Sequence, residues 1–272
     1  MRQADEGARS VTDKVLALLA AFDAQSSELT LSELARRADV SLSTAHRRVA
    51  ELVEWGALER TPAGRYRVGL RLWEVASLAP RGQRLREVAL PFLEDLYVVT
   101  RQNVQLAVRE GDELVFVERL AGREAVPVMT RVGGRFSLHA TGVGLVLLAF
   151  APADVQERVL SGDLTRYTEH TLTDPRELRR VLAQVRAEGF AVSDRMVTVD
   201  ALSVAAPVVD AAGTVVAAIS LVVLADDAAP IRSLVTTVRT AARGVSRALG
   251  MPVDLGSAPG GPPELLGQSS TE

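Results

Sequence analysis

LTLSELARRADVSLSTAHRRVAELVEWGALERTPAGRYRV, residues 29–68, contains two helical patterns, a polar break and two strand patterns in one run. In residues 31–38 the apolar side chains recur at helical spacing, which predicts a short helix with one buried stripe. Ser41 suits the N-cap of a second helix, in which apolar residues follow Ala45 at i+4, i+7 and i+8. Gly56 suits the end of that helix, because glycine adopts the left-handed conformation without a steric penalty.

After this second helix, residues 58–60 and 66–68 are predicted strands, and the Pro and Gly between them predict a turn. Together the segments predict a winged helix-turn-helix. The first turns of its second helix would face base edges, and the basic hairpin would lie along phosphates. The alternative interpretation is that the arginines only form the ordinary solvated face of an amphipathic helix. The residues that we expect to contact DNA are Ser41, Ser43, Thr44, Arg47, Arg48, Arg60, Arg65 and Arg67.

The charge of the chain is unevenly distributed. The 272 residues carry a formal net charge of -3, yet residues 36–71 hold eight arginines against four acidic residues, a local charge of +4. Attraction to nucleic acid depends on such a local patch more than on the total charge. An acidic protein can therefore still bind DNA through this segment.

Composition limits the remaining classes of protein. Hydrophobic residues make up 47% of the chain, enough for the cores of two domains. No stretch reaches the roughly 20 apolar residues of a membrane helix, and the N-terminal sequence MRQADEGARS has no apolar signal-peptide core. We therefore expect no membrane span and a cytoplasmic protein. The absence of cysteine removes disulfides, thiolate nucleophiles and cysteine metal sites.

The pattern along the chain predicts five parts. They are a disordered N-terminus (1–10), the winged helix-turn-helix domain (11–69), a linker helix (70–82), a second domain (83–250) and a disordered tail (251–272). Pro80, Arg81 and Gly82 are expected to break the chain between domains, and Pro91 to kink or restart the helix over 85–100. Further helices are predicted at 142–150, 175–188 and 231–249. Strands are predicted at 104–109, 113–119, 125–130, 203–209 and 215–224.

The chain resembles the IclR family of bacterial transcription regulators over nearly its whole length. The winged helix-turn-helix carries the resemblance together with RVGGRFSLHATGVGLVLLAF (131–150) and GFAVSDRMVTVDALSVAAPVVDAAGTVVAAISL (189–221). The resemblance implies an α+β fold: an N-terminal DNA-binding domain and a GAF-like effector-binding domain with an antiparallel sheet and flanking helices. It also implies a homodimer or homotetramer whose second domain binds a small organic acid.

The resemblance places the effector pocket around the LHATG segment, the segment after GFAV and the AIS strand. The positions that it implies here are Val128, Phe136, Gly142, Val143, Ser193, Ala201, Ser203, Ser220 and Val222. The backbone amides of Gly142 and Val143 would open a helix and could bind a carboxylate. Because pocket linings and cores share a composition, the alternative is that these positions only pack the core.

Three departures from the family pattern change the expected ligand. An acidic residue is common in the family where Ser193 stands, a cysteine where Ser203 stands and a second serine where Val222 stands. The pocket is therefore less polar than usual, and Phe136 is expected to add aromatic bulk. We hypothesise an effector larger than the smallest polar acids, namely a partly apolar or aromatic carboxylate.

Two other classes of function fit the sequence less well. An enzyme is disfavoured because there is no GxSxG nucleophile elbow, no zinc-spaced pair among His46, His139 and His170, and no phosphate-binding glycine loop. We expect His139 to be a buried, hydrogen-bonded packing residue, and we expect no metal or cofactor. A DNA-binding protein without a ligand would not need so large a second domain. The sequence therefore favours a ligand-responsive transcriptional repressor that binds a pseudo-palindromic operator.

Overall fold

The computed structural model describes residues 9–23, 25–123, 125–226 and 230–250. The chain divides into two compact units, Met1–Gln83 and Arg84–Glu272. The predicted tail at 251–272 and the predicted disorder at 1–8 lie outside the described residues. The prediction of disorder was wrong at Ser10, because this residue forms a capping box with Asp13 at the start of the first helix.

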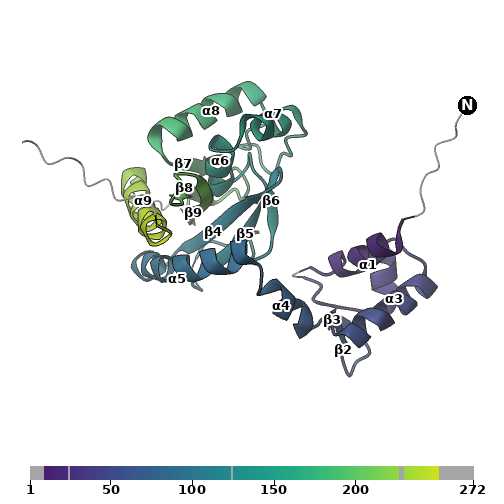
Figure 1. Cartoon of the computed structure of the whole chain (residues 1–272). Coiled ribbons are helices and arrows are strands. Elements are labelled where there is room, and N and C mark those ends of the chain that lie inside the picture. The colour runs from purple at the N-terminus through teal and green to yellow at the C-terminus, as the bar shows by residue number, and fades with distance from the viewer. Residues whose placement is uncertain (1–8, 24, 124, 227–229, 251–272) are drawn as a thin grey trace, which may run out of the picture. The chain divides into compact units, whose positions relative to one another are not determined.

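The N-terminal unit packs helices against a small antiparallel sheet of strand order β1-β3-β2 (Figure 1). A core that includes Leu18, Leu34, Val49 and Leu58 joins its helices to the sheet. This arrangement confirms the predicted winged helix-turn-helix. The elements are α1 (Val11–Ala20), β1 (Glu28–Leu29), α2 (Leu31–Arg37), α3 (Leu42–Trp55), β2 (Leu58–Arg60), β3 (Tyr66–Val68) and α4 (Leu70–Ala76).

The C-terminal unit is built on a six-stranded antiparallel sheet of order β6-β5-β4-β9-β8-β7. Helices cover both faces of this sheet, α5 and α9 on one side and α6 to α8 on the other (Figure 1). The strands are β4 (Asn103–Glu110), β5 (Glu113–Leu120), β6 (Arg135–Ser137), β7 (Ala191–Asp194), β8 (Ala201–Val209) and β9 (Val215–Leu224). The helices are α5 (Pro80–Thr100), α6 (Gly142–Ala149), α7 (Ala153–Ser161), α8 (Pro175–Glu188) and α9 (Ile231–Ala248).

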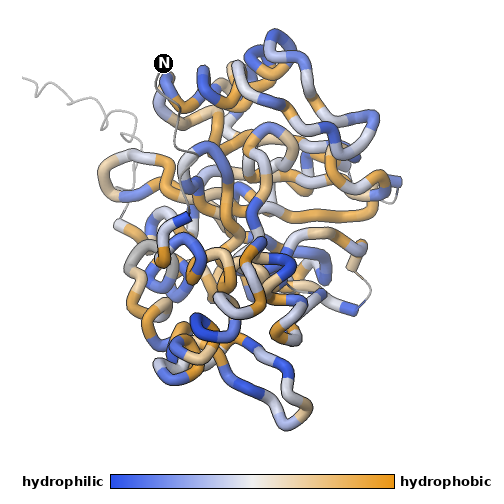
Figure 2. Tube along the Cα trace, turned by 90° about the vertical axis from the view of Figure 1, so that its right-hand side faces the viewer, coloured by the Kyte–Doolittle hydropathy of each residue, from blue (hydrophilic) through white to orange (hydrophobic). Residues whose placement is uncertain are grey.

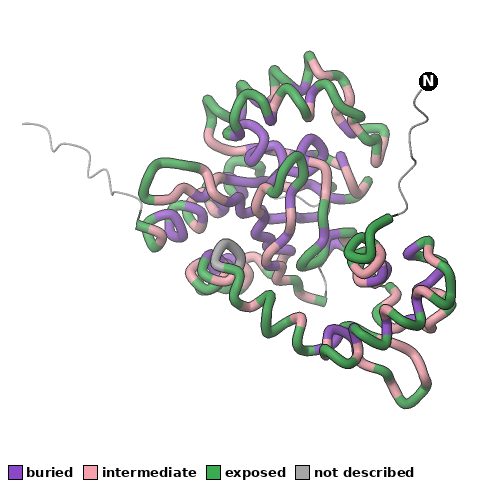
Figure 3. The backbone as a smooth tube through the Cα atoms, turned by 45° about the vertical axis from the view of Figure 1, so that its right-hand side comes forward, coloured by how far each residue is buried: buried purple, intermediate pink, exposed green. Residues whose placement is uncertain are grey.

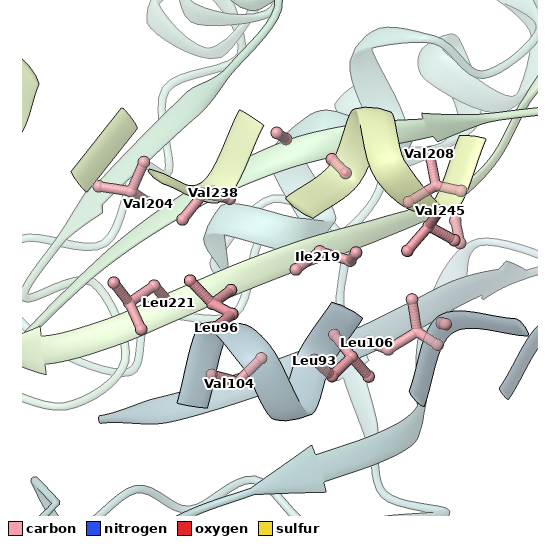
Figure 4. Packing of buried hydrophobic residues seen from close by; sticks show 14 of the residues in the cluster. Leu93, Leu96, Val104, Leu106, Val204, Val208, Ile219, Leu221, Val238 and Val245 are labelled. Carbon is pink, nitrogen blue, oxygen red and sulfur yellow. The ribbon is translucent and has the colours of Figure 1, made fainter. Parts of the chain in front are cut away.

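The central strands are buried on both faces, so the sequences of β8 and β9 are almost continuously apolar. Figure 2 shows these long hydrophobic stretches beside helices of mixed character, and Figure 3 shows burial concentrated on the sheet and the inner helix faces. On β9, Ile219 and Leu221 face α5 and α9, whereas Ser220 and Val222 face the opposite side. Figure 4 shows the hydrophobic cluster on the α5 and α9 side of the sheet, which includes Leu93 of α5, Val238 of α9 and Ile219 of β9.

Two predictions about the C-terminal unit were wrong. The first was the break expected at residues 80–82, because these residues form the first turn of α5, which begins at Pro80 and runs through Pro91 to Thr100 without restarting. A proline is tolerated in the first turn, where its missing N–H needs no partner, and Pro91 lies on the exposed side of the helix. The second was the strand at 125–130, which is a loop. The segment is held by side chains of β4 instead, because the Val126 carbonyl accepts a hydrogen bond from Asn103 and the Thr130 hydroxyl accepts one from Gln105.

Candidate functional site

The start of α3 carries a cluster of hydroxyl groups. Ser41 is the N-cap, as the sequence predicts, and its Oγ accepts a hydrogen bond from the Thr44 amide at 3.2 Å. The same Oγ donates to the Thr44 hydroxyl at 2.9 Å and lies 3.1 Å from that of Ser43. Ser41 and Ser43 are exposed, whereas Ala45 on the opposite face is fully buried. The first turn of α3 therefore presents small donors to solvent.

The predicted DNA-contacting arginines fall into two groups. Arg48, Arg65 and Arg67 are held in ion pairs with Glu51, Glu33 and Glu59 at 2.6, 3.1 and 2.8 Å. Arg47 and Arg60 have no ion pair within the described part of the chain. Because an ion pair already uses part of the charge and the N–H donors of a guanidinium, Arg47 and Arg60 are the better candidates for direct DNA contacts.

Arg65 also shapes the wing. Its Nη2 donates to the Glu28 carbonyl at 2.8 Å and to the Glu33 carboxylate, so it ties the hairpin to β1 and to the start of α2. Hydrogen bonds from the Thr30 amide and hydroxyl hold the pKa of Glu33 below its usual range. Glu33 is therefore ionised at neutral pH and available to Arg65.

The C-terminal unit contains a pocket on the α6 side of the sheet, with an empty volume of about 430 Å³ including its mouth. None of the lining side chains is charged. The residues that line the pocket are Gln105, Val128, Met129, Thr130, Thr141, Gly142, Val143, Ser193, Met196, Val197, Thr198, Ala201, Ser203 and Val222.

Two of the predicted effector positions do not line this pocket. Phe136 lies on β6 in an aromatic cluster, with ring centroids 6.1 Å from Phe116 and 5.8 Å from Tyr167. The expectation that Phe136 adds aromatic bulk to the pocket was therefore wrong. Ser220 is fully buried behind the lining, where it donates to the Gln105 side chain. The structure brings the other seven together: Val128, Gly142, Val143, Ser193, Ala201, Ser203 and Val222.

The first turn of α6 opens onto the pocket. Thr141 caps the helix, and its Oγ1 accepts a hydrogen bond from the Gly144 amide at 3.0 Å. Among the described residues, the amides of Gly142 and Val143 have no hydrogen-bond acceptor. A Cβ at Gly142 would lie 2.8 Å from Ser203 Oγ, so the glycine lets the helix start approach β8 closely. Two unpaired N–H donors thus meet the pocket beside a serine hydroxyl.

Sequence reasoning missed the residues that complete the lining. Gln105 is the most informative of them, because it is a polar residue 3% exposed that lies between Val104 and Leu106 in the buried part of β4. A buried polar side chain in such a strand is a signal that could have pointed to the site. The missed residues are Gln105, Met129, Thr130, Thr141, Met196, Val197 and Thr198.

The histidines do not form a reactive site. His139 is fully buried, and its Nε2 lies 3.0 Å from the Thr165 carbonyl oxygen, so the predicted packing role is confirmed. His46 is exposed on α3. Within the described ranges, no three His, Cys, Asp or Glu side chains gather as metal ligands. In the same ranges no helix is both long and apolar enough to cross a bilayer.

The fold and its two sites define the class of protein: a helix-turn-helix transcriptional regulator with a separate C-terminal domain. Two family descriptions match this chain, the IclR helix-turn-helix domain over residues 11–62 and the C-terminal domain of the bacterial transcriptional regulator IclR over residues 79–247. The chain belongs to the IclR family of bacterial transcriptional regulators. It is a DNA-binding regulator with an α+β fold, and its relatives are not known as enzymes.

Individual relatives agree with this assignment. The regulator BhcR of Paracoccus denitrificans is 35% identical over 80% of this chain and 78% of its own length. XynR of Escherichia coli is 30% identical over 88% of this chain and 97% of its own. An IclR homologue from Microbacterium hydrocarbonoxydans, crystallised with 4-hydroxybenzoate, is 40% identical. The structural match covers 88% of this chain and 99% of the chain of that homologue, with a TM-score of 0.84.

Proposed function

We propose that this regulator binds an aromatic or partly apolar carboxylate in the pocket of its C-terminal domain, and that the ligand changes its affinity for an operator. The observation that carries this proposal is the meeting of two unpaired α6 amides with an uncharged lining. The domain boundaries proposed for this activity remain 11–69 for DNA binding, 70–82 for the linker and 83–250 for the effector.

The α6 amides supply an anchor for the carboxylate. The N-terminus of a helix favours negative charge, because its first N–H groups lack partners and its dipole is positive there. Gly142 and Val143 offer such donors, and the hydroxyl of Ser203 lies beside them. Because the lining contains no lysine or arginine, these N–H and O–H dipoles would stabilise the negative charge of one carboxylate in place of a cation.

The remainder of the lining suits an apolar body. Val222 and Ala201 form a small hydrophobic cluster with Val126 and Val128, and Met196 adds an adaptable side chain. The Microbacterium hydrocarbonoxydans relative crystallised with 4-hydroxybenzoate supports an aromatic acid by analogy. The smallest polar acids would leave most of this surface uncovered.

On the DNA side, we infer a homodimer or homotetramer that places two α3 helices in major grooves about 34 to 36 Å apart, or a multiple of that, on a pseudo-palindrome. Repression is the proposed output, and it is supported by relatives named transcriptional repressor AllR in Escherichia coli and Klebsiella pneumoniae. The effector would favour one orientation of the DNA-binding domains over another.

The test uses the full chain and a DNA fragment from upstream of its own gene. Fluorescence anisotropy should detect saturable binding that unlabelled random DNA does not abolish. Added benzoate or 4-hydroxybenzoate should change the apparent Kd by about 5- to 150-fold, the usual range of allosteric coupling. If the protein binds the fragment and no aromatic acid alters its affinity, the ligand-independent DNA-binding alternative is favoured.

A further inference from the structure

Gln105 stands out among the pocket residues because its side chain has partners on two other segments. Its Nε2 donates to the Thr130 hydroxyl at 2.6 Å, and its Oε1 accepts from the Ser220 hydroxyl at 3.3 Å. Gln105, Thr130 and Ser220 are all buried. The carboxamide is therefore held in one orientation at the wall of the pocket, which makes it suitable for recognising a ligand group.

The sheet register separates Gln105 from the proposed carboxylate anchor. Gln105 lies on β4 opposite Ser220 of β9, and Ser203 lies on β8 opposite Val222 of the same β9. Two strand spacings across the sheet amount to about 10 Å. Gly142 of α6 contacts β8 at Ser203, so the anchor and the carboxamide lie on opposite sides of the apolar Val222.

The hydrogen-bonding capacity of the carboxamide indicates what it would bind. A glutamine side chain has two N–H donors and two acceptor sites on its oxygen, and each end of Gln105 uses one of them within the protein. One donor and one acceptor site remain. A hydroxyl group both donates and accepts, whereas a second carboxylate only accepts, and no lining side chain carries a charge to neutralise it.

We propose that Gln105 is a specificity-determining residue, which recognises a hydroxyl group on the effector at the end opposite its carboxylate. This inference rests on the proposed aromatic acid effector and names its second polar group. A ligand without that hydroxyl would cover the carboxamide and leave its free donor and acceptor unpaired. Such a loss typically weakens binding by about 5- to 150-fold.

A purely structural role for Gln105 makes a different prediction. Through Thr130 the residue also holds the loop 125–134, which carries Val128 and Met129 into the lining. If Gln105 only fixed this loop, its replacement would lower the affinity for every aromatic acid by the same factor. Recognition of a hydroxyl instead changes the ratio between two acids that differ at that group alone.

The experiment is isothermal titration calorimetry of the full chain with benzoate, 4-hydroxybenzoate and 4-methylbenzoate, since methyl and hydroxyl groups are similar in size. The wild type should bind 4-hydroxybenzoate about 5- to 150-fold more tightly than 4-methylbenzoate. Gln105→Leu should bring that ratio close to one. Gln184→Leu, at an exposed glutamine of α8, is the matched control and should keep the wild-type ratio.

The outcomes separate this inference from the proposed function. If the wild type binds none of the three acids, the proposed effector class fails and the inference fails with it. If it binds them without preference, or if Gln105→Leu keeps the preference for the hydroxyl, only the role of Gln105 is overturned. Should Gln105→Leu not fold, Ser220→Ala removes one partner of the carboxamide and must lower the same ratio, and an unchanged ratio would contradict the inference.

Discussion

Arg86 of α5 and Glu118 of β5 form an ion pair with 2.5 Å between Nε and Oε2, and the side chain of Glu118 is only 8% exposed. The other carboxylate oxygen of Glu118 accepts a hydrogen bond from the Arg119 amide at 2.8 Å. Arg119 donates to Asn103, which in turn donates to the Val126 carbonyl, each at 2.8 Å. Val126 forms a hydrophobic cluster with three residues of the pocket lining, Val128, Ala201 and Val222, so a series of contacts connects α5 with the pocket wall.

This connection predicts that Arg86→Met weakens the coupling between effector and DNA. The variant leaves the Glu118 carboxylate buried without its cation, which should lower the free energy of unfolding by about 1 to 3 kcal/mol, less than for a fully buried pair because Arg86 is 43% exposed. The effector-induced change in DNA affinity should shrink severalfold, while DNA affinity without effector stays closer to the wild type. Urea unfolding and anisotropy titrations measure the two quantities.

Arg84→Met is the matched control, because Arg84 is exposed on the same helix. It should leave both stability and coupling near the wild-type values. If Arg86→Met lowers stability while full coupling persists, the ion pair only supports the fold, and the route from pocket to α5 lies elsewhere.

A second prediction concerns α3. Arg47→Ala should weaken operator binding by about 1 to 3 kcal/mol if Arg47 reads a base, because this exposed guanidinium is not paired within the described part of the chain. Arg48→Ala should have a smaller effect, since Arg48 is engaged by Glu51 and its side chain is only 14% exposed. Anisotropy with operator and random DNA measures both. Arg180→Ala, at an exposed position of α8, serves as the charge-matched control. Equal losses of DNA affinity for all three variants would refute a specific role for Arg47.

How far the sequence predicted this molecule depends on whether a feature is local. The wing strands 58–60 and 66–68 were predicted with the observed bounds, and α8 as well, because turn residues, caps and periodicity mark them within a few positions. The segment 125–130 has the same apolar character as a strand. Whether it pairs depends on distant residues: side chains of β4 hydrogen-bond the Val126 carbonyl and the Thr130 hydroxyl, and no local pattern records that.

The pocket illustrates the same limit. The resemblance to the family located seven lining residues, five of which lie in the segments that carry the family motifs and two of which, Val128 and Val222, lie just outside them. Gln105 and Thr130 come from other segments and meet only through the sheet register and the loop contact. Phe136 lies close to the LHATG segment in sequence, but the pairing of β6 with β5 places it with Phe116 and Tyr167 instead.

The two glycines of α6 give a third prediction. Gly142→Ala should fold, because the added Cβ meets the rotatable Ser203 hydroxyl at 2.8 Å, but it should weaken aromatic acid binding at least about tenfold by crowding the amide donors. Gly144→Ala places its Cβ 2.3 Å from the Leu138 carbonyl oxygen and should destabilise the domain by about 1 to 3 kcal/mol. Calorimetry and urea unfolding separate the two effects. Unchanged affinity in Gly142→Ala would exclude the α6 amides as the anchor.

His139 gives a prediction about pH. Its burial lowers the pKa of the imidazole below the usual value, and Nδ1 has no hydrogen-bond partner within the described ranges. The folded state therefore binds fewer protons than the unfolded state once the pH falls below about 6.5, the ordinary histidine pKa. Stability from neutral His139 is fully present above that pH and is lost as the pH falls toward the lowered value.

The measurement is the free energy of unfolding by urea at several pH values between 7.5 and 5.5, for the full chain and for His139→Leu. The variant changes packing, so its stability differs from wild type at every pH, but that offset does not alter the slope. We expect the wild type to lose stability more steeply on acidification than His139→Leu does. Parallel pH profiles would mean that His139 takes up no extra proton on unfolding, and that the carboxylates held by arginines account for the whole acid sensitivity.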